Sequence, residues 1–242
     1  MAFLSWLPCG RGPSPTVKGG AAQSELRFTG CYGAAMAVHI VKHPLVAERL
    51  TSLRARTTER PEFRRNLHEL STFVLFDALR NLETTEIDID TPLEPTTGVR
   101  ITAPPLLIPV MRAGLGMLDS ALELLPKARV GFIGLKRDEA TLMPHAYANT
   151  VPEDLQGKAC LVLDPMLATG GSLAYTCELL LEANAGTITV ACLLASPEGI
   201  ELMTEKYPNV DVWTASVDEA LNDVGFIRPG LGDAGDRLFG LS

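Results

Sequence analysis

The run of residues 162–172 constrains this chain more than any other segment. It reads Val-Leu-Asp-Pro-Met-Leu-Ala-Thr-Gly-Gly-Ser. An apolar segment, residues 159–163, predicts a strand that ends at Asp164, and a helix is predicted to begin near Ser172. A strand, a tight loop and a helix N-terminus in this order direct backbone N–H groups toward one point, where the helix dipole adds positive potential. The run therefore predicts a phosphate-binding loop, in which Asp164 could accept a hydrogen bond from a sugar hydroxyl.

The two adjacent glycines of this run, Gly170 and Gly171, allow a simpler interpretation. A glycine turn can merely let a helix pack on a sheet. The P-loop pattern is absent because no lysine follows the glycines, and the Gly-x-Gly-x-x-Gly dinucleotide pattern is absent from this loop too. The whole run is more specific than its glycines, and a phosphate loop beside a hydroxyl acceptor favours a ribose phosphate as ligand.

Apolar, β-branched segments alternate with helical patterns from residue 106 onward. We expect strands at 106–111, 130–135, 159–163, 187–195 and 210–213, and helices at 116–125, 172–184 and 197–207. Before them we expect helices at 44–57 and 61–82 and an exposed strand at 86–90. This order predicts an α/β fold with a mostly parallel sheet flanked by helices on both faces. Ligands of such sheets bind beyond the carboxyl ends of the strands.

Composition narrows the class of protein. The 242 residues are 46% hydrophobic, which is enough for one full core. A net charge of −8 argues against a nucleic-acid partner, which is more often bound by a basic surface. The five cysteines form no Cys-x-x-Cys pair and favour a reducing, cytoplasmic location. No apolar run approaches the roughly 18 residues of a membrane span, so we expect no membrane partner.

Residues 1–34 differ from the rest of the chain. They are rich in Gly, Pro, Ser and Thr and show no sustained periodicity, so we expect a disordered N-terminal extension. Ordered sequence is predicted to begin near Met36, which is a candidate alternative start. On this hypothesis, deletion of residues 1–34 leaves activity and solubility unchanged.

Two arginines follow predicted strands at the ligand-binding edge. Arg112 precedes Ala113 and Gly114, and its planar guanidinium suits a diphosphate; capping of the strand end with the charge in water is the alternative. Arg137 opens residues 137–154, which have little helical pattern. We interpret this segment as an extended flap, a hairpin over the site, because long non-helical connections are often functional lids. The alternative is a solvated surface cluster.

The segment 225–240 contains five glycines in sixteen residues. Such a segment brings main chain close to a flat ligand, whereas the alternative is a flexible tail. The interleaved apolar residues Ile227, Pro229, Leu231 and Phe239 favour an ordered loop.

These three segments agree in order and spacing with a known family. Asp-Pro-Met-x-Ala-Thr-Gly-Gly-Ser, Arg-Ala-Gly and Gly-Leu-Gly-Asp-Ala-Gly resemble the motifs of uracil phosphoribosyltransferases, which use 5-phospho-α-D-ribose 1-diphosphate (PRPP). The resemblance covers residues 36–242. It implies a type I phosphoribosyltransferase-like domain at 35–242 with a flexible flap and a C-terminal base-binding hood at 222–242. Many related families have two acidic residues where this chain has Asp164 and Pro165, but the uracil branch has this form.

The resemblance also implies the site residues. Asp164, Arg137 and Asp233 take the catalytic positions. The PRPP-binding positions are Arg112, Arg137, Asp164, Pro165, Met166, Leu167, Ala168, Thr169, Gly170, Gly171, Ser172 and Asp233. The uracil-binding positions are Ile227, Gly232, Asp233 and Ala234, of which Ile227, Gly232 and Ala234 act through the main chain.

Further expectations concern cofactors and partners. Mg²⁺ is expected to arrive bound to PRPP rather than in a protein-held metal site, because no His/Cys/Asp spacing of a metal cage is visible. GTP is a candidate activator in this family, although no motif here predicts it. The expected partners are the small molecules uracil and PRPP and further copies of the chain in a homo-oligomer.

The implied reaction converts uracil and PRPP to UMP and diphosphate, the salvage route to pyrimidine nucleotides. The edge of uracil presents an acceptor, a donor and an acceptor, which backbone groups can complement. In cytosine, N3 is an acceptor rather than a donor, and an amino donor replaces O4. Each buried mismatch costs about 1–3 kcal/mol, so we expect uracil to be preferred over cytosine by about a hundredfold or more. Two alternatives stay open: a purine or orotate phosphoribosyltransferase, and a nucleotide-binding regulator that attenuates RNA.

Overall fold

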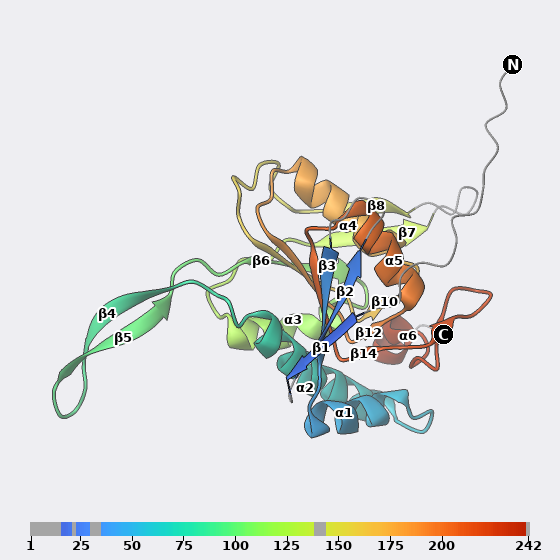
Figure 1. Cartoon of the computed structure of the whole chain (residues 1–242), viewed down its shortest axis with the longest axis horizontal. Coiled ribbons are helices and arrows are strands. Elements are labelled where there is room, and N and C mark those ends of the chain that lie inside the picture. The colour runs from blue at the N-terminus through green and yellow to red at the C-terminus, as the bar shows by residue number, and fades with distance from the viewer. Residues whose placement is uncertain (1–15, 21–22, 30–34, 138–143, 241–242) are drawn as a thin grey trace, which may run out of the picture.

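The computed structural model describes residues 16–20, 23–29, 35–137 and 144–240. At its centre is a nine-stranded sheet (Figure 1). Its strands are β1 (Thr16–Gly20), β2 (Gln23–Thr29), β3 (Ala35–Val41), β6 (Leu106–Met111), β7 (Ile133–Arg137), β8 (Pro144–Asn149), β9 (Cys160–Leu163), β11 (Ile188–Ala191) and β13 (Asp211–Thr214). The spatial order is β1-β2-β3-β13-β11-β9-β6-β7-β8. The neighbours from β3 to β7 pair in parallel, which confirms the predicted α/β fold.

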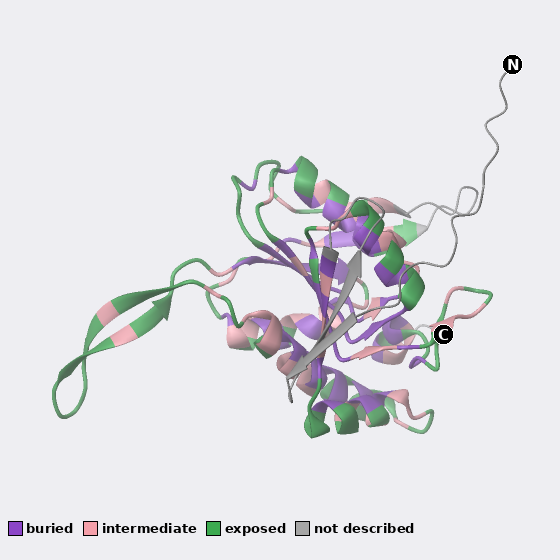
Figure 2. Cartoon of the chain, in the orientation of Figure 1, coloured by how far each residue is buried: buried purple, intermediate pink, exposed green. Residues whose placement is uncertain are grey.

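Helices cover both faces of this sheet. They are α1 (Pro44–Arg54), α2 (Arg60–Ala78), α3 (Leu115–Leu124), α4 (Gly171–Glu182), α5 (Pro197–Lys206) and α6 (Ala234–Phe239). One apolar core joins the sheet to α1, α2, α3 and α6, and a second joins it to α4 and α5. The buried residues of Figure 2 follow these two layers. The strands β6 and β9 are apolar throughout because both of their faces are covered.

The helix starts follow their local sequence. Proline occupies the first turn of α1, α2 and α5, where a backbone N–H would have no intrahelical acceptor in any case. The Oγ of Ser196 caps α5 by accepting the N–H of Gly199 at 2.9 Å. The two N-terminal helices are shorter than the sequence predicted. They end at Arg54 and Ala78, not at residues 57 and 82.

The expectation of a disordered extension does not hold for two of its segments. Residues 16–20 and 23–29 form the strands β1 and β2, and β2 pairs antiparallel with the full length of β3. An unpaired strand edge attracts another strand because its N–H and C=O groups need partners. Glycine- and serine-rich composition hid this pairing in the sequence. Residues 1–15, 21–22 and 30–34 of the expected extension lie outside the described part of the chain.

The strand predicted at residues 187–195 is two strands. After β11 the chain leaves the large sheet, and the N–H groups of Leu193 and Leu194 both donate to the carbonyl of Pro165. A small parallel sheet then follows, formed by β10 (Met166–Leu167), β12 (Leu194–Ala195) and β14 (Ser216–Val217). The strand predicted at 130–135 is shifted similarly, because Val130 makes only an isolated bridge and β7 begins at Ile133.

One hairpin projects from this body, and another forms an edge of the central sheet. β4 (Thr84–Asp90) and β5 (Pro95–Ile101) form an arm that extends away from the helices and is mostly exposed (Figures 1 and 2). The sequence predicted only its first strand. β7 and β8 pair antiparallel, as expected of the flap, and residues 138–143 between them lie outside the described part of the chain.

Candidate active site

The predicted phosphate loop follows β9 at the carboxyl edge of the sheet. Gly170 is the N-cap of α4 and has a φ of +79°, a left-handed conformation that favours glycine. A Cβ there would also crowd the Leu202 side chain, at 2.9 Å. Within the described α4, the first turn has no acidic residue and the cap makes no side-chain hydrogen bond. The first N–H groups of a helix have no intrahelical acceptor, so they remain available to an anion.

Carbonyl groups of this loop accept hydrogen bonds from residues 193–196, the segment before α5. Pro165 accepts the two N–H groups described above, and Leu167 accepts the N–H of Ser196 at 2.9 Å. Ala168 accepts the hydroxyl of Ser196 at 2.6 Å. These carbonyls are therefore occupied by the segment before α5 and do not compete for the N–H groups at the start of α4. This geometry supports anion binding.

Asp164 is a buried carboxyl at the start of this loop, with 9% of its surface exposed. Burial raises its pKa to about 7, opposed only weakly by the N–H of Met166, which donates to Oδ1 at 3.2 Å. Removal of water destabilises the charged form, and that single hydrogen bond does not compensate. A perturbed carboxyl at the ligand edge of an α/β sheet is typical of a functional group.

Arg112 follows β6, the neighbour of β9. A Cβ on Gly114 would overlap the carbonyl oxygen of Leu163, so glycine allows the Arg112 loop to lie against the end of β9. The guanidinium is about half exposed and reaches toward α6, where its Nη2 lies 3.6 Å from Oδ1 of Asp236.

The C-terminal hood completes the edge. β15 (Ala220–Leu221) and β16 (Ile227–Arg228) form a short antiparallel pair, and α6 follows. Asp233 is the N-cap of α6 and accepts the N–H of Asp236 at 2.8 Å. Gly232 has a φ of +82°. A Cβ on Gly235 would lie 3.8 Å from Nη2 of Arg112, which places the hood beside the arginine loop.

The hood also approaches the phosphate loop. A Cβ on Gly225 would lie 3.4 Å from Cγ2 of Thr169. A cavity of about 370 Å³ opens beside the hood, lined by Thr58, Arg60, Gly232, Asp233, Asp236 and Arg237. The three predicted segments therefore meet at one edge of the sheet, although the first and the last of them are more than a hundred residues apart in sequence.

The roles of all the predicted site residues stay predictions. Arg137 ends β7, but the position of its side chain is not described, so its role stays a prediction. Sequence reasoning missed other residues around the hood: Arg54, Asp218, Asp236 and Arg237. Arg54 looked like an ordinary basic residue of a last helical turn. Asp236 and Arg237 lie in the hood motif itself, but no pattern distinguished them there.

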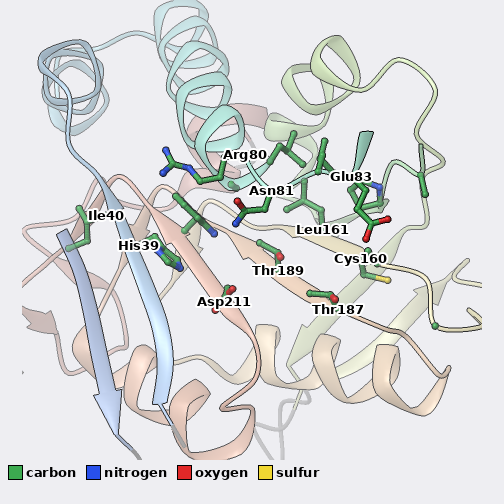
Figure 3. Close-up of a pocket in the computed structure, with 18 residues that line it drawn as sticks. His39, Ile40, Arg80, Asn81, Glu83, Cys160, Leu161, Thr187, Thr189 and Asp211 are labelled. Carbon is green, nitrogen blue, oxygen red and sulfur yellow. The ribbon is translucent and has the colours of Figure 1, made fainter. Parts of the chain in front are cut away.

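A larger cavity, of about 630 Å³, lies at the opposite, amino edge of the strands (Figure 3). Its wall includes Thr187, Thr189 and Asp211 and the segment after α2. The rings of His39 and Trp213 stack there at 4.1 Å. The residues that we assign to PRPP and the base lie at the other end of the sheet, so this cavity is separate from the candidate active site.

Two further findings concern the described residues alone. They contain no group of three or more His, Cys, Asp or Glu side chains that could hold a metal ion. None of their helices combines the length and the hydropathy needed to cross a membrane.

Comparison with known proteins gives a consistent result. The family model for uracil phosphoribosyltransferase matches residues 40–241. A protein of that name from Streptomyces griseus subsp. griseus is 52% identical over 208 residues, which cover 85% of this chain and 99% of the relative. One from Nocardioides sp. is 51% identical over 211 residues, with 85% and 99% coverage. The solved structure of the AQ2163 protein from Aquifex aeolicus is similar, with a TM-score of 0.79, 36% identity, and coverage of 85% of this chain and 99% of that chain.

Proposed function

Because the chain belongs to the uracil phosphoribosyltransferase family, we propose that it converts uracil and PRPP to UMP and diphosphate. The observation that carries the proposal is the meeting of the Asp164 loop, the Arg112 loop and the hood at one edge of the sheet. A phosphate site, a diphosphate site and a base site are then neighbours, as transfer of a phosphoribosyl group requires.

The ribose phosphate is assigned to the loop after β9. The backbone N–H groups of residues 167–172 bind the 5′-phosphate, and the hydroxyls of Thr169 and Ser172 assist. Asp164 accepts a hydrogen bond from a ribose hydroxyl and orients the sugar. No nucleophilic side chain is needed, because uracil N1 attacks C1′ directly as the diphosphate leaves, so the protein contributes position and electrostatics.

The leaving diphosphate is assigned to Arg112 and Arg137. Their charges stabilise the negative charge that develops on the departing group. The β7–β8 flap shields the activated sugar from water. Asp233 lies between the two substrates and contacts both.

Mg²⁺ fits this site as a companion of PRPP. The buried carboxyl of Asp164 lacks a cationic partner among the described residues, and a cation carried by the substrate favours its ionised form. Mg²⁺ would supply charge neutralisation on the diphosphate, with Asp164 as the nearby carboxylate.

Replacement of Arg137 by alanine tests the flap. We expect kcat/KM to fall at least about tenfold, because a charged donor to the leaving group is lost. Steady-state kinetics with varied PRPP measures the change. Lys136→Ala is the matched control, since it removes the neighbouring positive charge of the same strand. Equal kinetics for Arg137→Ala and wild type would exclude Arg137 from the reaction.

Replacement of Gly232 by valine tests the hood. The φ of +82° strains any other residue, and the new side chain projects beside the main-chain groups assigned to the base. We expect the KM for uracil to rise more than the KM for PRPP. Gly157→Val is the control, because Gly157 has a φ of +74° with no atom near its Cβ position and lies away from the hood. A larger effect on PRPP than on uracil would contradict the assignment.

The direct test is formation of UMP from uracil and labelled PRPP, with and without GTP. Uracil is expected to react, and cytosine, orotate and purines are expected to react poorly. Reaction with orotate or a purine instead would support the alternative base class. Binding of RNA at physiological salt without transferase activity would support the regulator. A higher rate with GTP would support activation by that nucleotide.

A homo-oligomer and a cytoplasmic location are further parts of the proposal. The β4–β5 arm exposes Leu93 at 95% and Val99 at 71%, and apolar side chains on a projecting hairpin favour contact with another protein surface. The buried cysteines Cys160, Cys177 and Cys192 are free thiols, which is consistent with a reducing compartment. Sedimentation tests the oligomer, and a monomer at micromolar concentration would contradict it.

A further inference from the structure

An ion pair joins the end of α1 to the hood. The carboxylate of Asp218, in the segment after β14, has 2% of its side chain exposed. Arg54, the last residue of α1, donates to both of its oxygens, at 2.6 Å from Nη1 and 2.5 Å from Nη2. The hydroxyl of Ser216 donates to Oδ1 at 2.9 Å. These donors hold the pKa of Asp218 below its usual range despite its burial.

The same pair holds the main chain of Gly230 from two sides. The N–H of Gly230 donates to Oδ2 of Asp218 at 2.9 Å, and its carbonyl accepts Nη1 of Arg54 at 2.9 Å. Gly230 has a φ of +60°, and a Cβ there would overlap the carbonyl of Ile227. This residue lies between Ile227 and Gly232, two positions assigned to the base. The orientation of Gly230 therefore fixes the turn that carries the base-reading groups.

A second arginine fixes the next residue. Arg237 of α6 donates to the carbonyl of Leu231 at 2.9 Å. It also donates to the carbonyls of Leu53 and Ala55, which end α1 and have no helical partner. Its guanidinium lies over the ring of Phe63, at 4.2 Å from the ring centre. The end of α1 thus contacts the hood through two arginines, one from each side.

We propose that Arg54 and Asp218 are positioning residues for base selection. Neither side chain touches the base. Together they set the spatial order of the main-chain donors and acceptors of residues 227–234, and that order distinguishes uracil from cytosine. This inference rests on the proposed function, since it assigns a role within the same site.

The physical reason is that the hood is proposed to recognise the base through main-chain N–H and C=O groups. Backbone groups discriminate only if their positions are fixed, because a displaced loop offers its N–H and C=O groups in other directions. The hood and the two residues before it contain only two short strands and one short helix, so regular structure alone supplies little rigidity. A bidentate arginine–carboxylate pair is directional and supplies the missing constraint.

Two variants test the inference. Asp218→Asn keeps the shape but replaces one acceptor oxygen by an amide donor, which cannot accept from Arg54 or Gly230. The double variant Arg54→Met/Asp218→Leu removes both charges, and such replacements of buried pairs usually leave a folded protein. The matched control is Arg49→Met, because Arg49 is another arginine of α1 and pairs with Glu48 and Glu69, away from the hood.

We expect both test variants to raise the KM for uracil about tenfold or more, as lost hydrogen bonds to a charged group imply. The kcat and the KM for PRPP should change by less than about threefold, and the preference for uracil over cytosine should fall. Arg49→Met should match wild type in all four quantities. A folded double variant with an unchanged KM for uracil and unchanged preference would overturn the inference, as would equal losses for both substrates.

The wild-type protein separates this inference from the proposed function. If wild type forms UMP and the variants keep its base preference, only the positioning role of Arg54 and Asp218 is wrong. If wild type forms no UMP from uracil and PRPP, the proposed function is wrong and the positioning role falls with it.

Discussion

Replacement of Asp164 by asparagine is expected to stabilise the free protein at alkaline pH while it removes most of the activity. The pKa of the folded state, about 7, lies above the value of 3.8 for an unperturbed carboxyl. Below pH 3.8 the carboxyl is protonated in both the folded and the unfolded state, and its full contribution to the free energy of unfolding is present. This contribution is lost as the pH rises from 3.8 through about 7, because the unfolded state then ionises more readily than the folded state. Asparagine stays neutral and keeps an oxygen for the N–H of Met166.

The stability gain should depend on pH. At 1.36 kcal/mol per pKa unit, the variant is expected to exceed wild type by about 2 kcal/mol at pH 5 and by about 4 kcal/mol at pH 8, as upper bounds. Urea unfolding of both proteins measures this difference. Asp223→Asn is the control, because it makes the same substitution at an exposed position. A gain that is equal at pH 5 and pH 8 would show that Asp164 is not desolvated in the free protein.

The activity of Asp164→Asn is expected to fall, although its stability rises. We expect kcat/KM for PRPP to fall about a hundredfold, since a charged acceptor for the ribose hydroxyl is lost. In wild type, kcat/KM should fall as the pH drops through about 7, because the neutral carboxyl is a weaker acceptor. An active Asp164→Asn enzyme would remove Asp164 from the site.

Replacement of Asp233 by alanine should nearly abolish activity and also weaken the hood. The proposed role gives Asp233 contacts with both substrates, and the structure gives it a second role as the cap of α6. Loss of such a cap costs about 1 kcal/mol of folding free energy. Kinetics and thermal unfolding should therefore both change in Asp233→Ala.

Asp233→Asn separates these two roles. Asparagine caps helices about as well as aspartate, so the unfolding temperature should stay near that of wild type. Activity should still be low because the charge is absent. Full activity of Asp233→Ala would contradict the dual contact. A loss of activity in alanine but not in asparagine would mean that only the cap matters.

The sequence was sufficient for the parts of the fold that depend on local patterns. Most strands and helices of the parallel core follow from apolar periodicity, with the exception of β3, and the Asp164 loop follows from its run of small residues. The strands β1 and β2 were missed because their pairing with β3 depends on an open sheet edge rather than on their own composition. The break between β11 and β12 was missed because it depends on the distant carbonyl of Pro165.

The candidate site shows the same limit. Arg112, Asp164 and Asp233 lie in recognisable motifs, so the sequence suggested them. Arg54 and Asp218 lie in none, and only the folded chain brings them together. A single charged residue at a helix end has many ordinary explanations, and its partner here is 164 residues away.

The contacts between α1 and the hood affect the order in which parts of the chain fold. They join residues separated by 164 and 184 positions, near the two ends of the domain. Contacts of such long range form late, since closure of the intervening loop is entropically unfavourable until the rest is in place. On the ribosome, residues 227–234 can therefore take their final position only after Arg237 has emerged. A nascent chain that stops before Arg237 would carry the proposed phosphate loop without the proposed base selection.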